Sequence, residues 1–253
     1  MVGVIKPLLL AAATISAHAG IACAQQTPPQ HLLESIQEIS GVPGMSAAVL
    51  VNGEIVWTGA AGSADIGSGR NVTDETKFRI ASVSKLFTAA LVLKLSEDGL
   101  LDLDADIRDY VPAWPTHGGA TITLRQLAAH ISGIGHYSSA DLYDPSQSYP
   151  TLTDSIAIYG HKPLLFSPGE NYRYSSYGYA LMGAAVEAVS GQSFENAMNE
   201  MILGPMDLDN TALEDASAVP PNATTLYSID SGQVEISRNS QNHVRGATGM
   251  LST

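Results

Sequence analysis

The chain of 253 residues has little cysteine and little positive charge, and it has no long apolar run after its first 24 residues. Its single cysteine, Cys23, cannot form an internal disulfide or a multi-thiolate site, which excludes disulfide scaffolds, zinc ribbons and iron–sulfur proteins. Lysine and arginine number 12 against 25 aspartates and glutamates, and the net charge of -13 disfavours a nucleic-acid partner or an anionic membrane surface. The hydrophobic content of 45% excludes disorder and predicts a globular protein with a real core.

The first 24 residues have the order of features of a secretory signal peptide. Lys6 is followed by an apolar run from Leu8 to Ala17 and then by small residues that end at Ala24. Because this run is too short to span a bilayer as a helix, we predict a signal peptide over residues 1–24 and a secreted or periplasmic protein. No membrane span is expected after cleavage. An uncleaved anchor and lipidation at Cys23 are alternatives, although the residues around Cys23 match a lipobox poorly.

Hydrophobic spacing and turn residues predict both strands and helices in the mature chain. We expect a hairpin of residues 45–51 and 54–60, because the intervening Asn52-Gly53 favours the positive φ of a tight turn. A second strand pair is expected within residues 224–237. An isolated hairpin is marginal in water, so the sheet is either very small or continues beyond Thr253. Helices are expected over residues 30–40, 82–98, 123–130, 177–190 and 194–203.

Several common catalytic signatures are missing, which leaves Ser82-Val83-Ser84-Lys85 as the strongest candidate. The sequence has no G-x-S-x-G, H-E-x-x-H, G-x-x-x-x-G-K-[ST] or helix-opening G-x-G-x-x-G. A serine is a weak nucleophile until a base takes its proton, and a lysine desolvated on an apolar helix has the lowered pKa that this needs. Ser82 and Lys85 are three residues apart and share one helical face. The alternative is a capping serine beside a solvated lysine.

A second candidate element is Tyr174-Ser175-Ser176, just before the helix expected from Tyr177. A phenol beside Ser82 and Lys85 can relay a proton to a leaving group, whereas the alternative is a polar loop that leads into a helix cap. We interpret His130 and His136 as packed, hydrogen-bonded residues rather than as catalysts. No histidine or carboxylate set has the spacing of metal ligands, so we expect no metal and no cofactor.

Five ordered motifs resemble the serine β-lactamase-like family, which includes class C β-lactamases, D-alanyl-D-alanine carboxypeptidases and related esterases. The resemblance runs from about Leu33 to Thr253, and His136-Tyr137 with the Tyr-Ser-Ser triplet is most similar to the mitochondrial-type members. It implies one α+β domain over residues 25–253 with a β-lactamase/transpeptidase-like fold, in which helices flank a small antiparallel sheet and residues 102–211 form an all-helical lobe. The five motifs are Phe78 to Lys85, Gly99 to Asp104, Leu127 to Ile134, Phe166 to Gly169 and Tyr174 to Tyr179.

The resemblance implies a role for each candidate residue. Ser82 would be the acylated nucleophile, Lys85 its base partner and Tyr174 the general acid/base. Ser176 would be a substrate-binding residue, at a position where most relatives have an asparagine that holds the substrate amide. A peptidase or esterase is therefore expected more than an efficient β-lactamase.

We expect a hydrolase that acts on amide or ester bonds of a small-molecule or peptide substrate, through an acyl-enzyme on Ser82. The alternative is a non-catalytic or single-turnover penicillin-binding or sensor domain. Residues 246–253 resemble a G-G-L-x-S-T segment, after which relatives continue with a K-T-G or H-x-G motif. The chain is therefore expected to be incomplete at its C-terminus. The sequence gives no indication of the oligomeric state.

Overall fold

The computed structural model describes residues 29–138, 149–215, 218–230, 233–236 and 244–253. The predicted signal peptide with Cys23, and the turn Ser231-Gly232 of the predicted strand pair, lie outside the described residues. Within these ranges, no helix combines the length and the apolar character that crossing a membrane requires. The same ranges contain no group of histidine, cysteine, aspartate and glutamate side chains that could hold a metal ion.

The first described elements form a small antiparallel sheet with one helix against it. The helix α1 (Pro29–Ser40) packs on the hairpin of β1 (Gly44–Val51) and β2 (Glu54–Asp65), and β3 (Arg70–Asn71) extends the sheet in the order β1-β2-β3. Asn52 and Gly53 have φ values of 52° and 85°. Both are the positive values that the predicted hairpin turn requires. The predicted helix over residues 30–40 and the hairpin are confirmed.

Two further small antiparallel groups of strands follow. β4 (Phe78–Arg79), β8 (Met250–Ser252) and β5 (Ala212–Leu213) make a sheet in the order β4-β8-β5. These strands are two or three residues long, and such short runs carry no alternating pattern from which a strand can be predicted. β6 (Tyr227–Asp230) pairs with β7 (Gln233–Ile236), which confirms the strand pair expected within residues 224–237.

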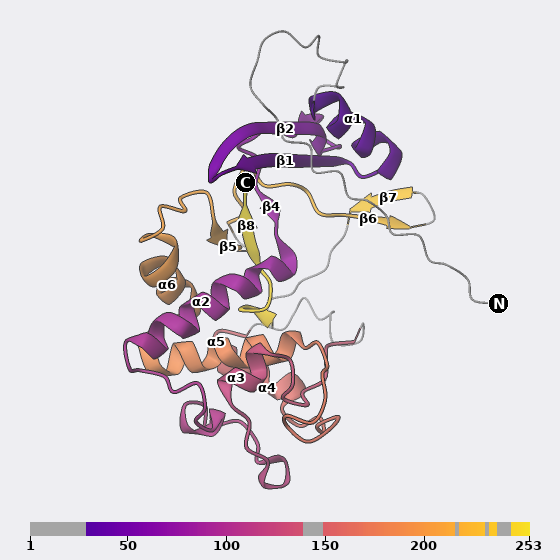
Figure 1. Cartoon of the computed structure of the whole chain (residues 1–253). Helices are drawn as coiled ribbons and strands as arrows, with labels where there is room; N and C mark the ends of the chain where they lie inside the picture. The colour runs from indigo at the N-terminus through magenta and orange to yellow at the C-terminus, as the bar shows by residue number, and fades with distance from the viewer. Residues whose placement is uncertain (1–28, 139–148, 216–217, 231–232, 237–243) are drawn as a thin grey trace, which may run out of the picture.

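The helix α2 (Ser84–Glu97) lies between the strands and the helices α3, α4 and α5, whose bounds follow below (Figure 1). The sequence predicts a helix from Ser82, but Ser82 lies in a 3₁₀ turn, η1 (Ala81–Val83), that precedes the α-helix. The apolar residues of this segment, among them Leu86 and Leu91, are distributed nearly all round the helix, a pattern that predicts burial on nearly all sides. That expectation is wrong, because Leu91 is fully buried whereas Leu86 is 71% exposed.

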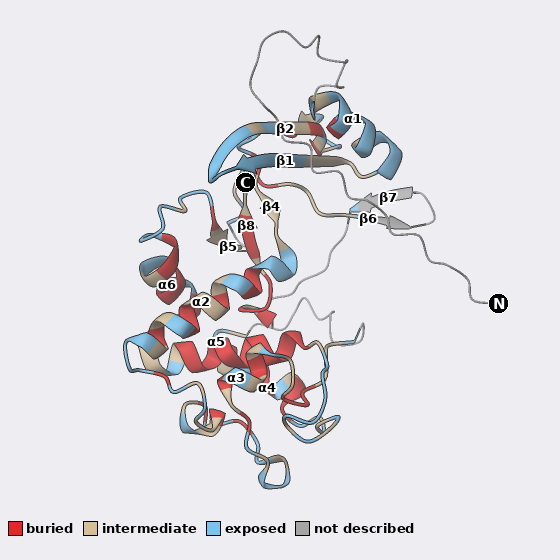
Figure 2. Cartoon of the chain, viewed as in Figure 1, coloured by how far each residue is buried: buried red, intermediate tan, exposed pale blue. Residues whose placement is uncertain are grey.

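The helix α5 (Ser176–Ser190) is the centre of the core, and Figure 2 shows most of its length buried. It packs against α2, α3 (Leu124–Ala128), α4 (Leu152–Tyr159) and α6 (Phe194–Met198). α6 continues as a π-helical turn, η5 (Asn199–Leu203), so the predicted helix over residues 194–203 is present in two parts. The sequence predicts α5 and α3, although α3 ends at Ala128, two residues before the predicted end. It does not predict α4.

The regular elements in the described part of residues 102–211 are helical. Besides α3 to α6 and η5, they are the short 3₁₀ helices η2 (Ile107–Asp109) and η3 (His117–Gly119). This segment and α2 contribute most of the large core cluster, in which Leu95, Ile107 and Leu124 are fully buried. The core therefore surrounds α5 and gives a rigid base to the loops at the N-terminal end of this helix.

Candidate active site

Ser82 is held on a tight turn between β4 and α2. Ala81, directly before it, has a φ of 44°, a left-handed conformation that is uncommon for a residue with a side chain. The Ser84 hydroxyl donates a hydrogen bond of 2.6 Å to the Ala81 carbonyl and so closes the turn. Ser82 itself is exposed, at the point where α2 begins. The turn therefore presents the Ser82 hydroxyl to solvent on a rigid support.

The Lys85 side chain points into the protein and is only 6% exposed. Its Nζ donates hydrogen bonds to Ser82 Oγ at 3.2 Å, to Ser176 Oγ at 3.2 Å and to the Ala247 carbonyl oxygen at 2.8 Å. These acceptors match the three N–H bonds of an ammonium group. Burial lowers the pKa of Lys85, and the hydrogen bond and charge interaction with Tyr174 raise it back only in part. The amine therefore loses its proton more readily than an ordinary lysine does.

Tyr174 approaches Ser82 from the segment that precedes α5. Its hydroxyl donates a hydrogen bond of 2.8 Å to Ser82 Oγ, and its ring centroid lies 4.9 Å from Lys85 Nζ. Burial alone raises the pKa of Tyr174, but hydrogen bonding to Lys85 and Ser82 and the charge of Lys85 outweigh it, so the pKa lies below its ordinary value. The amine and the phenol are therefore both able to give up a proton more easily than usual.

The N-terminus of α5 adds the fourth predicted residue, Ser176. It is 2% exposed, and its hydroxyl accepts the hydrogen bond from Lys85. The preceding residue, Ser175, caps the helix by accepting from the Gly178 N–H at 3.1 Å and donates to the Gly135 carbonyl at 2.8 Å. The structure thus brings together all four residues that the sequence singles out, from two separate segments of the chain.

The Ala247 carbonyl is a part of the site that residue-by-residue reasoning missed. It makes the shortest of the three hydrogen bonds to Lys85. A backbone oxygen leaves no side-chain signature in a sequence. The only available signal was the resemblance of residues 246–253 to a family motif, which pointed to the segment but not to the atom.

His130 and His136 border the site from the loop that follows α3. Nδ1 of His130 accepts the Ser175 N–H at 3.2 Å, and Nδ1 of His136 accepts the Ser176 N–H at 3.1 Å. Their rings lie against the Tyr174 ring, with centroids 4.6 Å and 5.4 Å away. This confirms their interpretation as packed, hydrogen-bonded residues.

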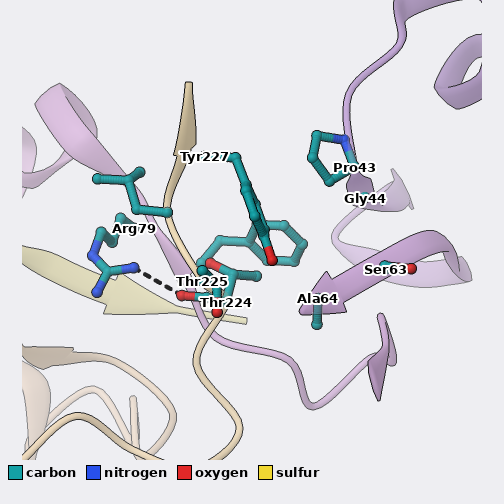
Figure 3. Close-up of a pocket in the computed structure, with 10 residues that line it drawn as sticks. Pro43, Gly44, Ser63, Ala64, Arg79, Thr224, Thr225 and Tyr227 are labelled. Carbon is teal, nitrogen blue, oxygen red and sulfur yellow. Dashed lines mark hydrogen bonds between the residues drawn. The ribbon is translucent and has the colours of Figure 1, made fainter. Parts of the chain in front are cut away.

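A cavity of about 170 Å³ lies elsewhere, between β2, β4 and residues 224–227 (Figure 3). Arg79 borders it and donates from Nη1 to the Thr224 carbonyl oxygen at 2.8 Å. The residues that line this cavity include none of the four candidate site residues. The cavity is therefore separate from the chemistry that Ser82 and Lys85 can perform.

These contacts fit acyl transfer. An exposed hydroxyl is hydrogen-bonded to a buried amine and to a phenol, both of which have lowered pKa values. A nucleophile with two adjacent groups that exchange protons is the arrangement that covalent catalysis on a serine needs.

Known proteins are similar to this chain in sequence and in fold. It is 27% identical over 264 residues to the human mitochondrial serine beta-lactamase-like protein LACTB, a match that covers 78% of this chain and 48% of the relative. It is 30% identical over 182 residues to penicillin-binding protein 4 of Amycolatopsis lactamdurans, covering 71% of this chain and 47% of the relative. The chain therefore spans about half the length of these curated relatives.

The solved structure of the octameric penicillin-binding protein homologue from Pyrococcus abyssi matches with a TM-score of 0.75 and 26% identity. The match covers 88% of this chain and 53% of that one. This likeness confirms the predicted β-lactamase/transpeptidase-like α+β fold. The sequence profile of the beta-lactamase family matches residues 30–253. Since that match spans nearly all of the residues that form the fold and the site, the chain belongs to the beta-lactamase family.

Proposed function

We propose that the protein is an exported serine hydrolase that forms an acyl-enzyme on Ser82 and cleaves amide or ester bonds. The observation that carries the proposal is the buried Lys85 amine, 3.2 Å from Ser82 Oγ, with the Tyr174 hydroxyl 2.8 Å from the same oxygen. A buried lysine is costly unless it is paired or has a task. Membership of the beta-lactamase family supports the same reading.

Acylation begins when the Ser82 hydroxyl gives its proton to the neutral Lys85 amine or to the Tyr174 phenolate. Both groups donate to Ser82 Oγ when protonated, so one of them must first lose its proton, and their lowered pKa values favour this. Ser82 Oγ then bonds to the substrate carbonyl carbon. The carbon–nitrogen or carbon–oxygen bond to the leaving group breaks, and Tyr174 gives the departing atom a proton. If Lys85 took the serine proton, that proton then passes from Lys85 to Tyr174, which restores both groups. A water molecule gives one proton to the same base and attacks the ester carbonyl carbon, the bond to Ser82 Oγ breaks, and the proton passes to Ser82 Oγ as the acid is released.

The substrate preference follows from Ser176. Its hydroxyl is short and is occupied by the Lys85 amine, so it reaches less far toward a substrate amide than the asparagine of most relatives. We therefore propose a peptidase or esterase rather than an efficient β-lactamase. The order of features in residues 1–24 supports export. A single-turnover penicillin-binding or sensor domain is the second candidate, which the similarity to penicillin-binding protein 4 favours.

Labelling of Ser82 tests the proposal. The wild-type protein and Ser82→Ala are incubated with a fluorophosphonate and with a fluorescent penicillin, and intact mass is measured alongside hydrolysis of a p-nitrophenyl ester. We expect an adduct and ester turnover that are both absent in Ser82→Ala. Ser68→Ala, an exposed serine in the turn between β2 and β3, serves as the matched control and retains both. A stable adduct without turnover selects the second candidate, and a wild-type protein that forms no Ser82-dependent adduct contradicts both.

A further inference from the structure

Two histidines hold the backbone that carries Tyr174 and Ser176. The Ser175 N–H donates to His130 Nδ1 and the Ser176 N–H donates to His136 Nδ1, so two successive amides of one segment depend on two imidazole acceptors. A third contact, from the Ser175 hydroxyl to the Gly135 carbonyl, joins the same two segments. The loop of residues 130–136 therefore fixes the residues that approach Ser82 and Lys85.

An imidazole nitrogen accepts a hydrogen bond only while it carries no proton. Acceptance at Nδ1 assigns both rings to the neutral form with the hydrogen on Nε2. A proton added at Nδ1 would turn the acceptor into a donor that faces another N–H. The two amides would then lose their partners in a part-buried region, where an unpaired polar group is costly.

We propose that His130 and His136 are positioning residues whose neutral rings lock the Tyr174–Ser176 backbone in place, so that protonation of either ring disassembles the site. The inference rests on the proposed function, because the positioned groups are Tyr174 and Ser176. It adds to that function a pair of acid-sensitive hydrogen bonds that position the site, and neither histidine needs to contact the substrate.

The surroundings of both rings favour the neutral form. Burial lowers the pKa of His130, and the charge of Lys85 and the neighbouring His136 lower it further. Burial also lowers the pKa of His136, with added effects from the charges of Lys85 and Arg173. The titratable or charged groups that face the two rings are Lys85 of α2, Tyr179 of α5, and Tyr137, Tyr172, Arg173 and Tyr174 of the adjoining loops.

The sign of the pH effect follows from the lowered pKa values. The neutral rings contribute fully above about pH 6.5, the ordinary histidine value, and their contribution falls as the pH drops through the lower value of the folded protein. Tyr174 lies directly before the two held amides, so release of this backbone moves its hydroxyl away from Ser82 Oγ. A displacement of about 1 Å at a reacting group can cost about a hundredfold in rate.

Asparagine and leucine variants distinguish a role of the histidines as hydrogen-bond acceptors from a role in packing alone. The asparagine side-chain oxygen stands close to the position of Nδ1 and accepts a hydrogen bond, but it does not titrate. The fluorophosphonate labelling rate is measured from pH 4.5 to 8.5 for wild type, for His130→Asn, His136→Asn and their double variant, and for the two leucine variants. His161→Asn, which changes an exposed histidine, is the matched control and leaves the wild-type profile in place.

Protonation of Lys85 and Tyr174 slows labelling of every variant as the pH drops, and we expect a further, steeper fall in the wild type below the histidine pKa values. The double asparagine variant lacks this further fall, whereas each leucine variant is labelled about a hundredfold more slowly than the wild type above the histidine pKa values. An acid limb that is the same in wild type and in the double asparagine variant overturns the inference.

A second measurement does not depend on activity. Nitrogen chemical shifts of the two imidazoles report the tautomer, and hydrogen-exchange protection factors report the Ser175 and Ser176 amides. We expect Nε2–H rings at pH 8 and protected amides that lose protection as the rings titrate. Rings with the hydrogen on Nδ1, or protection that does not change as they titrate, overturn the inference. If the wild type is unlabelled at every pH, the proposed function fails while this measurement still decides the role of the histidines.

Discussion

Lys85 shows why a residue type, and not only a charge, matters at this site. Lys85 is 6% exposed, and its amine gives one hydrogen bond to each of three oxygens. An arginine keeps the positive charge, but its guanidinium does not lose a proton in proteins. If the amine acts as a base, Lys85→Arg lowers the rate of Ser82 acylation by at least about a hundredfold, the usual contribution of a positioned base.

The rate of fluorophosphonate labelling measures this effect, and thermal unfolding shows whether the variant is folded. Lys94→Arg is the matched control, because Lys94 lies on the same helix and pairs with Asp98 at the surface. Its labelling rate stays at the wild-type value. A Lys85→Arg protein that is folded and labelled at the wild-type rate would exclude Lys85 as the base.

Site residues that lie close together in the sequence were easier to predict than those that only the fold brings together. Ser82 and Lys85 lie three positions apart, so helical spacing alone places them on one face. Tyr174 and Ser176 lie about 90 residues further along, and only their resemblance to family motifs connected them with Ser82. The acceptor nitrogens of His130 and His136 depend on the path of a loop, and no pattern in the sequence encodes that path.

At the scale of elements, the capping box of α3 supports the approach to His130. The Thr123 hydroxyl accepts the Gln126 N–H at 3.2 Å, and the Gln126 side chain accepts the Thr123 N–H at 3.0 Å. Loss of such a cap costs about 1 kcal/mol. We expect Thr123→Ala to lower the free energy of unfolding by about 1 kcal/mol in urea titrations. Thr116→Ala, at an exposed N-cap position without a side-chain hydrogen bond, is the control; equal losses in the two variants contradict the prediction.

Elements with a local stop signal were predicted better than elements made by distant contacts. Helix α5 ends at Ser190, and the next residue, Gly191, caps it with a φ of 67°, as the sequence indicates. The sheet β4-β8-β5 joins residues near 78, 212 and 250, and its pairing is fixed by tertiary contacts. The helix α4 was missed although Thr151 and Asp154 form a capping box, a signal that the sequence offered.

At the scale of the whole molecule, exposed apolar side chains gather on the hairpin of β1 and β2. Leu50 and Ile55 are each 63% exposed, and Figure 2 shows most of β1 and the first part of β2 as exposed. Helical segments supply most of the large core cluster, so in the described residues the sheet of the hairpin is the less buried part of the fold. Contacts that join the β-strands to segments far away in the sequence are therefore important for the stability of the sheets.

Arg79 provides such a contact, because it joins β4 to two segments that lie more than 130 residues further along the chain. Its guanidinium pairs with both carboxylate oxygens of Glu214 and donates to the Thr224 carbonyl. The two charged side chains are only 25% and 19% exposed, so water screens the pair weakly. Removing one partner leaves the other charge poorly solvated. We expect Arg79→Ala and Glu214→Ala each to lower the free energy of unfolding by about 1–3 kcal/mol.

A double-mutant cycle measured by urea unfolding tests this link. The combined variant should lose less than the sum of the two single losses, with a coupling of about 1 kcal/mol, because the second substitution removes a charge that is already unpaired. The pair of Arg125 with Asp104 is the matched control, since its side chains are 61% and 64% exposed and its coupling should be smaller. If the losses at Arg79 and Glu214 simply add, the ion pair does not stabilise the packing of β4 against the segment that follows β5. Any loss in Arg79→Ala then comes from its other contacts, which include the hydrogen bond to Thr224.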